Sequence, residues 1–257
     1  MARGNRIIGR SGYMHIVKRG INHQDIFIDK SDYEFFLKLL LELKEEMKFE
    51  IIAYCLMSNH FHLLVHDDNA QFSKIVQRLM TRYVMHFNWK YNRTGSLCEG
   101  RYTGRVIENE SYLLTAVRYI HNNPVSAGLS LAEEYQWSSY PEYIGKVPAK
   151  HRLCNTDLIL SLFSNKDTFM EFHRAVIHLD NYEQINDMHH MEGKSEIADI
   201  DIRSIVKVMT GSDEPFILQR LEKEERDKVI RYLKKLRVPM AQLVRITGLN
   251  IGVIKRA

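Results

Sequence analysis

Two histidines separated by one residue are the sharpest chemical feature of the sequence. His60 and His62 flank Phe61 in the segment NHFHLLV. In a strand, side chains two positions apart point to the same face, about 6.6 Å apart, and the residue between them points to the other face. Two imidazoles placed in this way can bind one divalent cation while Phe61 enters the core. Ordinary surface or core histidines would show the same spacing, so the pair alone leaves both interpretations open. His66 has the same parity, but it would lie about 13 Å beyond His62, too far to share an ion.

A tyrosine and an asparagine four residues apart form a second candidate group. Tyr119 and Asn123 occur in the segment RYIHNNP, which ends at Pro124. On a helix they would lie on one face, one turn apart. A phenol could then act as a nucleophile while an amide oxygen contributes a ligand to the same ion. The alternative is structural: most of the 13 tyrosines must be packing residues, and an asparagine before a proline commonly ends a helix.

Hydrophobic periodicity predicts the elements that would position these residues. Alternating or continuous apolar patterns predict strands over residues 11–20, 49–57, 60–66 and 101–107. Helical spacing predicts helices over residues 33–47, 72–92 and 111–123. We expect Ser31 or Asp32 to cap the first helix and Pro124 to stop the third. The order strand, helix, strand, strand, helix, strand, helix predicts a ferredoxin-like α+β fold, an antiparallel sheet with packed helices.

The second half of the sequence has a different character. Residues 125–150 contain Trp137, Tyr140 and Tyr143 and are expected to pack onto the first domain. Residues 151–182 are predicted to be helical, residues 183–200 are polar and are predicted to form a linker, and residues 200–257 are again helical. We therefore expect three parts: an α+β domain over 1–147, a helical connector and linker over 148–199, and an all-α region over 200–257.

The C-terminal residues have a pattern typical of a helix-turn-helix. We expect a first helix over residues 240–246, Gly248 in the turn, and a second helix from Asn250 with Ile251 and Ile254 facing inward. From Arg226 to Ala257 there are nine basic residues and one acidic residue, which suits a polyanionic partner. Within this segment, the candidate DNA contacts are the basic residues Arg245 and Lys255 and the amide of Asn250. A solvated basic face, or two short amphipathic helices around a glycine, remains the alternative.

Composition excludes several classes of protein. Hydrophobic residues make up 45% and charged residues 26% of the 257 residues, as in an ordinary globular protein. Apolar runs stay well below the 18 or so residues of a membrane span, and the first residues lack the apolar region of a secretory signal. The three cysteines, Cys55, Cys98 and Cys154, are far apart in the sequence and form no CxxC motif. We therefore expect a cytoplasmic protein without a disulfide framework.

Four segments together resemble a known family. His60-Phe61-His62 resembles the histidine–hydrophobic–histidine (HUH) signature, and Tyr119 with Asn123 resembles the tyrosine helix of single-tyrosine HUH transposases. The surrounding segments YMHIVKRG, CLMSNHFHLLV, GRYTGRVIENESYLL and RYIHNNPVSAGL are similar to the REP-associated tyrosine transposase branch, over about residues 8–145. Transposases of autonomous insertion sequences usually carry Gln four residues after the tyrosine. Asn123 stands there in this sequence, as in the REP-associated branch.

The resemblance implies an enzyme that cuts and rejoins single-stranded DNA. Carried over to this chain, Tyr119 is the nucleophile that forms a 5′-phosphotyrosine, and His60, His62 and Asn123 hold Mg²⁺ or Mn²⁺. Arg19, Arg101 and Arg105 are expected to contact the DNA near the cleavage site. The implied partner is single-stranded or hairpin DNA, and the implied location is the bacterial nucleoid; the sequence leaves monomer and homodimer open. Two alternatives remain, a DNA-binding regulator without cleavage and a metal-dependent nuclease that uses water.

Overall fold

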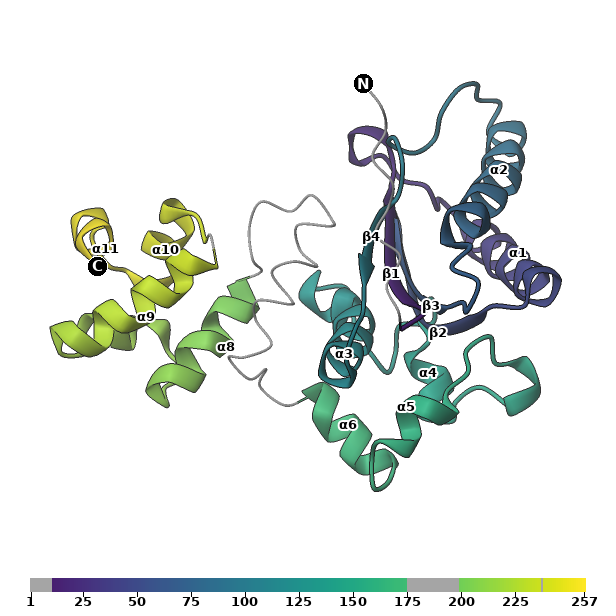
Figure 1. Cartoon of the computed structure of the whole chain (residues 1–257). Helices are drawn as coiled ribbons and strands as arrows, with labels where there is room; N and C mark the ends of the chain where they lie inside the picture. The colour runs from purple at the N-terminus through teal and green to yellow at the C-terminus, as the bar shows by residue number, and fades with distance from the viewer. Residues whose placement is uncertain (1–10, 175–198, 237) are drawn as a thin grey trace. The chain divides into compact units, whose positions relative to one another are not determined.

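The computed structural model of the chain describes residues 11–174, 199–236 and 238–257 (Figure 1). It divides into two compact units, Met1–His173 and Arg174–Ala257. The expected parts had boundaries at 147/148 and 199/200, so the first unit takes in helices that the sequence assigned to a connector. The predicted polar linker, apart from its last two residues, lies outside the described residues. None of the described helices is long and apolar enough to cross a membrane.

A four-stranded antiparallel sheet forms the centre of the first unit. Its strands are β1 (Tyr13–Arg19), β2 (Glu50–Met57), β3 (His60–His66) and β4 (Thr103–Val106). They are ordered β2-β3-β1-β4, and every neighbouring pair is antiparallel. This is the strand order that the ferredoxin-like prediction requires. The predicted fold class is confirmed.

Three long helices accompany the sheet. They are α1 (Lys30–Met47), α2 (Phe72–Lys90) and α3 (Glu110–Ser126). Helices α1 and α2 pack against each other, and α3 packs mainly against β2 and β3. Phe61 of β3 contacts Phe36 of α1, with ring centroids 4.8 Å apart, so the face that carries Phe61 is the one that α1 covers. The opposite face, which carries His60 and His62, is left for α3.

Two helix ends differ from the sequence-based expectation. Helix α1 is capped by Asp29, whose side chain accepts hydrogen bonds from the backbone of Ser31 and Asp32. The backbone N–H of Asp29 in turn donates to the side chain of Asp32, which completes a capping box. The prediction that Pro124 stops α3 was wrong. The helix continues to Ser126, because a proline in the last turn gives up only one hydrogen bond to the carbonyl four residues before it.

Shorter helices complete the first unit. They are the 3₁₀ segments η1 (Ile21–His23) and η2 (Ala149–His151) and the helices α4 (Tyr140–Tyr143), α5 (Asp157–Ser161) and α6 (Lys166–Arg174). Tyr140 and Tyr143 are almost fully buried, and Trp137 stacks on Tyr33 with ring centroids 4.5 Å apart. The aromatic side chains after α3 therefore pack onto the sheet domain.

The second unit is helical and has its own core. Its elements are α8 (Asp199–Thr210), η4 (Pro215–Gln219), α9 (Lys223–Lys235), α10 (Met240–Thr247) and α11 (Ile251–Arg256). Aliphatic side chains from all five elements meet in one buried cluster, which includes Ile205, Leu218, Leu233, Leu243 and Ile254. This unit is thus held together by its own apolar contacts.

Candidate active site

Strand β3 presents two buried histidines on the face that α3 covers. His60 is 7% and His62 0% exposed, and the two ring centroids lie 5.1 Å apart. Phe61 between them is also fully buried but lies on the opposite face. The strand alternation predicted from the sequence is therefore present, and the two imidazoles are neighbours.

Each of these histidines has a defined partner at its Nδ1 atom. The Nδ1 of His60 lies 2.6 Å from the Oδ1 of Asn59. The Nδ1 of His62 lies 3.0 Å from the Nε2 of His15, which is fully buried in β1. In the β1–β3 register Val17 is opposite His62, so His15 lies diagonally across on the same face. The sequence pattern placed His15 on a strand face but gave it no role, because the pairing of the two strands is needed to find its partner.

Helix α3 brings Tyr119 to the histidines. The ring of Tyr119 is edge-on to His62 and to His15, with centroid distances of 5.8 and 6.2 Å. One turn later, Asn123 is almost fully buried, and its Nδ2 donates to the carbonyl of Tyr119 at 3.3 Å. That bond fixes the amide and leaves its Oδ1 as the atom that could accept or coordinate. The structure therefore brings together the tyrosine and the histidines that the sequence singled out.

Helix α6 contacts α3 through residues adjacent to Tyr119 and Asn123. The Nδ1 of His121 and the Nε2 of His173 share a hydrogen bond of 3.0 Å, and Asn122 donates to the carbonyl of His173. The guanidinium of Arg118 lies over the ring of Phe172, 5.1 Å from its centroid. The sequence motifs gave His121 and Asn122 no role. They attach the tyrosine-bearing helix to α6.

The histidine pair between α3 and α6 is buried and held neutral. Burial lowers the pKa of His173 to about 3; the hydrogen bond to the carbonyl of Phe169 opposes this shift and the charge of Arg118 adds to it. Burial, and then repulsion from His173, moves the pKa of His121 well below its ordinary value. The second ring nitrogen of His121 shares a hydrogen bond of 2.8 Å with the hydroxyl of Ser139.

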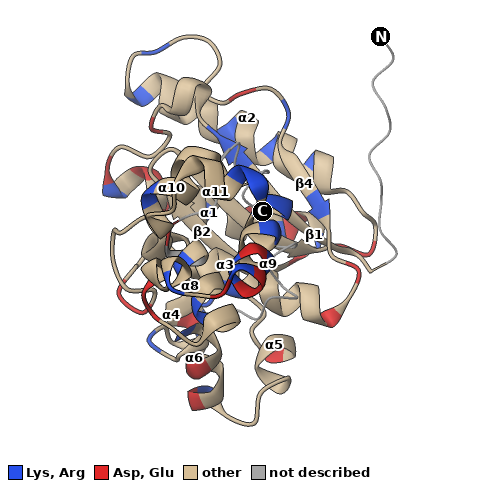
Figure 2. Cartoon of the chain, turned by 90° about the vertical axis from the view of Figure 1, so that its left-hand side faces the viewer, with Lys and Arg blue, Asp and Glu red and all other residues tan. Residues whose placement is uncertain are grey.

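The basic residues predicted to contact DNA near the cleavage site lie in or beside strands β1 and β4. Arg19 is opposite His60 in the β1–β3 register, and Arg105 of β4 is opposite His15. Both therefore share the face of the histidines. Arg101 and Arg105 are exposed, and Figure 2 shows basic colouring on β4. The three arginines thus lie on or next to the strands that carry the site.

In the second unit, the residues of the predicted helix-turn-helix form two short helices, α10 and α11, on either side of Gly248. Helix α10 ends at Gly248, whose φ of 66° is left-handed, and Asn250 caps α11 by accepting from the backbone of Gly252 at 2.8 Å. Lys255 is exposed near the end of α11, where basic residues are visible at the C-terminus in Figure 2. Arg245 is also exposed and pairs with Asp199 of α8. The expectation that Ile251 faces inward was wrong: it is 47% exposed, since the capping turn leaves Ile254 as the buried contact of this short helix.

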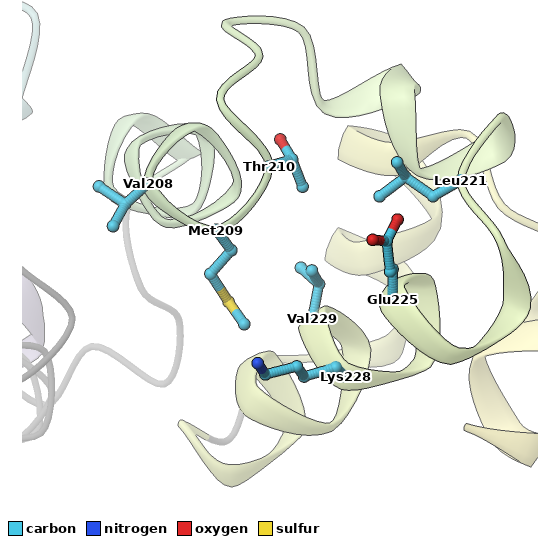
Figure 3. A pocket seen from close by; sticks show the side chains of 7 residues that line it. All are labelled: Val208, Met209, Thr210, Leu221, Glu225, Lys228 and Val229. Atoms are coloured by element: carbon cyan, nitrogen blue, oxygen red, sulfur yellow. The ribbon is translucent and has the colours of Figure 1, made fainter.

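A pocket of about 420 Å³ lies in the second unit and contains none of these residues (Figure 3). It is lined by residues of α8, of α9 and of the turn before α9: Val208, Met209, Thr210, Leu221, Glu225, Lys228 and Val229. Its lining is mostly apolar. Among the residues that the structure describes, no three His, Cys, Asp or Glu side chains gather as a metal-binding group, so a cation at the histidine pair would need a different third ligand.

The comparisons with known proteins concern the first unit. Residues 10–123 match the IS200-like transposase family. This match confirms the resemblance of the sequence motifs to that family. This segment includes all four strands, His60, His62, Tyr119 and Asn123.

Two further comparisons were made, with solved structures and with curated proteins. The structure is similar to that of a REP-associated tyrosine transposase bound to a REP hairpin, with 18% sequence identity and a TM-score of 0.47. That similarity covers 58% of this chain and 89% of the other. Curated proteins give no match to the chain.

Proposed function

We propose that the protein cleaves and rejoins single-stranded DNA through a covalent bond between Tyr119 and a 5′-phosphate. The observation that carries the proposal is the position of the Tyr119 ring, edge-on to His62 and His15 above the histidine face of the sheet. The family match over residues 10–123 supports this chemistry, because that family is one of transposases. A phenol beside a pair of imidazoles is a nucleophile next to groups that can bind a cation.

The proposed reaction exchanges one phosphodiester for another. The phenol oxygen of Tyr119 forms a bond to the scissile phosphorus, and the bond from phosphorus to the 3′-oxygen breaks. The phenolic proton leaves Tyr119, and the departing 3′-oxygen takes up a proton to give a free 3′-hydroxyl. Because the phosphotyrosine is a diester like the bond it replaces, a 3′-hydroxyl can attack it later and restore a DNA strand.

The proposed ligands are chemically suited to a divalent cation. His60 and His62 would supply imidazole nitrogens and Asn123 the Oδ1 of its amide, a mixed set that suits Mg²⁺ or Mn²⁺. When bound, such a cation supplies Lewis-acid polarisation of the phosphate. Arg19 and Arg105, on the same face as the histidines, would hold the phosphates that flank the scissile one.

The second unit would bind the DNA outside the cleavage site. Its left-handed Gly248, the Asn250 cap and the exposed Lys255 match the geometry of a helix-turn-helix whose second helix enters a groove. Arg245 and Asn250 are the other candidate contacts, and Arg245 would exchange its pairing with Asp199 for a phosphate. We propose a hairpin with a double-stranded stem as the substrate, as the sequence resemblance to the REP-associated branch implies, and the bacterial nucleoid as the place of action.

Trapping a covalent adduct tests the catalytic proposal. The full chain is incubated with a 5′-labelled or 3′-labelled hairpin oligonucleotide and Mn²⁺, and the products are separated under denaturing conditions. We expect a protein–DNA adduct that carries only the 3′-side label, and a peptide map that places it on Tyr119. Tyr119→Phe should fold and bind DNA but form no adduct, whereas the matched variant Tyr112→Phe, on the same helix, should form it normally.

The same experiment separates the alternatives. Cleavage without an adduct would identify a nuclease that uses water and would refute the role of Tyr119. DNA binding without cleavage in the presence of Mg²⁺ or Mn²⁺ would identify a regulator. An adduct on another tyrosine would refute the assignment of the nucleophile.

A further inference from the structure

The hydrogen bond between His15 and His62 has a chemical consequence for cation binding. An imidazole that binds a cation through Nε2 must present a lone pair there, so the neutral ring carries its proton on Nδ1. The Nδ1 of His62 is 3.0 Å from the Nε2 of His15. Only one of these two nitrogens can hold the proton that lies between them. The choice decides whether His62 can act as a ligand.

The neighbouring histidine shows the arrangement that favours binding through Nε2. The Nδ1 of His60 faces the Oδ1 of Asn59 at 2.6 Å, and a carbonyl oxygen can only accept. The amide orientation of Asn59 is supported by its Nδ2, which donates to the carbonyl of His23. His60 is therefore held with its proton on Nδ1. For His62 to carry its proton on Nδ1 as well, the Nε2 of His15 must accept a hydrogen bond from it, as the Oδ1 of Asn59 does from His60.

His15 is placed as a positioning group and not as a ligand. Its Nε2 points at the ring of His62, and the two rings stack with centroids 5.2 Å apart at an angle of 25°. The ring of His62 lies 5.2 Å from that of His15 and 5.1 Å from that of His60, yet the described residues contain no cluster of three His, Cys, Asp or Glu side chains that could hold a metal. The ring is fully buried in β1, in the middle of the sheet, so its orientation is fixed by packing.

We propose that His15 accepts a hydrogen bond from Nδ1–H of His62 and thereby holds His62 in the one tautomer that can bind a divalent cation. The inference rests on the proposed function, since it assumes that His62 is a metal ligand. If His15 instead donated from Nε2, the proton of His62 would move to Nε2 and block the ligand position. Loss of such an orienting partner typically lowers metal affinity 10–100-fold.

Metal titration of the full chain tests the proposal with a readout other than activity. Free Mn²⁺ is followed by electron paramagnetic resonance for the wild type, His15→Phe and His15→Gln. His15→Phe keeps a buried ring but has no acceptor, and we expect its Mn²⁺ affinity to fall 10–100-fold. The Gln side chain of His15→Gln can accept through its amide oxygen. Its Mn²⁺ affinity should therefore stay within about threefold of the wild-type value, well short of the 10–100-fold loss. His66→Phe, on the same face of β3, is the matched control and should bind like the wild type.

The outcomes distinguish this inference from the proposed function. A wild type that binds no Mn²⁺ refutes the metal site itself. A wild type that binds, with His15→Phe binding equally well or His15→Gln failing as badly as His15→Phe, refutes only the role of His15. Should His15→Phe fail to fold, long-range ¹H–¹⁵N spectra of the wild type still decide the matter. They should show His62 protonated on Nδ1, and protonation on Nε2 would overturn the proposal.

Discussion

The buried histidine pair between α3 and α6 should make the first unit lose stability as the pH falls below about 6.5. An unfolded histidine takes up a proton near pH 6.5, whereas His173 in the folded chain does so at about pH 3. Between these values the unfolded chain binds more protons, so acidification favours unfolding. From pH 7.0 to 5.5 this difference costs about 1.2 kcal/mol for His173, and the lowered pKa of His121 adds to the loss.

Tryptophan fluorescence can isolate this effect. The only two tryptophans, Trp89 and Trp137, belong to the first unit, so urea unfolding followed by their emission reports that unit alone. Glu142 works in the opposite direction, because burial raises its pKa and its protonation at low pH relieves a buried charge. The informative quantity is therefore the difference between the wild type and His173→Gln, which removes one titrating group from the pair.

We expect His173→Gln to lose about 1.2 kcal/mol less than the wild type between pH 7.0 and 5.5. His151→Gln, at an exposed position, is the matched control and should lose as much as the wild type. Equal losses in the wild type and His173→Gln would show that the pair is protonated in the folded protein. The account of α6 as a neutral, buried support for the tyrosine helix would then be wrong.

Three further predictions concern the proposed site and the second unit. His60→Ala or His62→Ala should abolish adduct formation and weaken Mn²⁺ binding, with Asn123→Ala milder because an amide is the weakest of the three ligands; full activity in excess chelator would contradict this. Gly248→Ala should destabilise the second unit by about 2 kcal/mol in circular dichroism melts, because the residue has φ 66° and its Cβ would fall on Gln219 and Phe216. Gly211→Ala, with φ 74° in open space, should cost only about 1 kcal/mol, and equal losses would show that packing around Gly248 is loose. Replacing Lys255 and Arg256 by Gln should reduce the slope of log affinity for the hairpin against log salt concentration by about 0.9 for each phosphate that the protein no longer neutralises. Lys223→Gln should leave this slope unchanged. An unchanged slope in the Lys255 and Arg256 variant would mean that α11 is a solvated basic face.

Local sequence patterns were sufficient for most of the sheet domain. The strand over residues 60–66 was predicted with the bounds that the structure gives it, since alternation and turn residues act within a few positions. The proximity of Tyr119 to His62 followed from the family resemblance and from no local pattern. Partners such as His15 and His173 depend on strand register and helix docking, which no short-range signal encodes. Pro124 and Ile251 were misjudged for the same reason: a helix end is decided by its last hydrogen bonds and its packing, as well as by residue type.

Side chains along β3 alternate between the two faces of the sheet, so neighbouring residues of this strand have different surroundings. Phe61, Leu63 and Val65 hold the sheet to the helices on one side, while His60 and His62 face Tyr119 on the other. A single substitution of His60 or His62 would therefore remove a proposed metal ligand and leave the core-facing side chains of the strand unchanged. An insertion or deletion of one residue would instead exchange the two faces and destroy both at once. If the chain cuts DNA as proposed, a form that binds DNA without cutting it needs only one substitution, at a position that leaves the core unchanged.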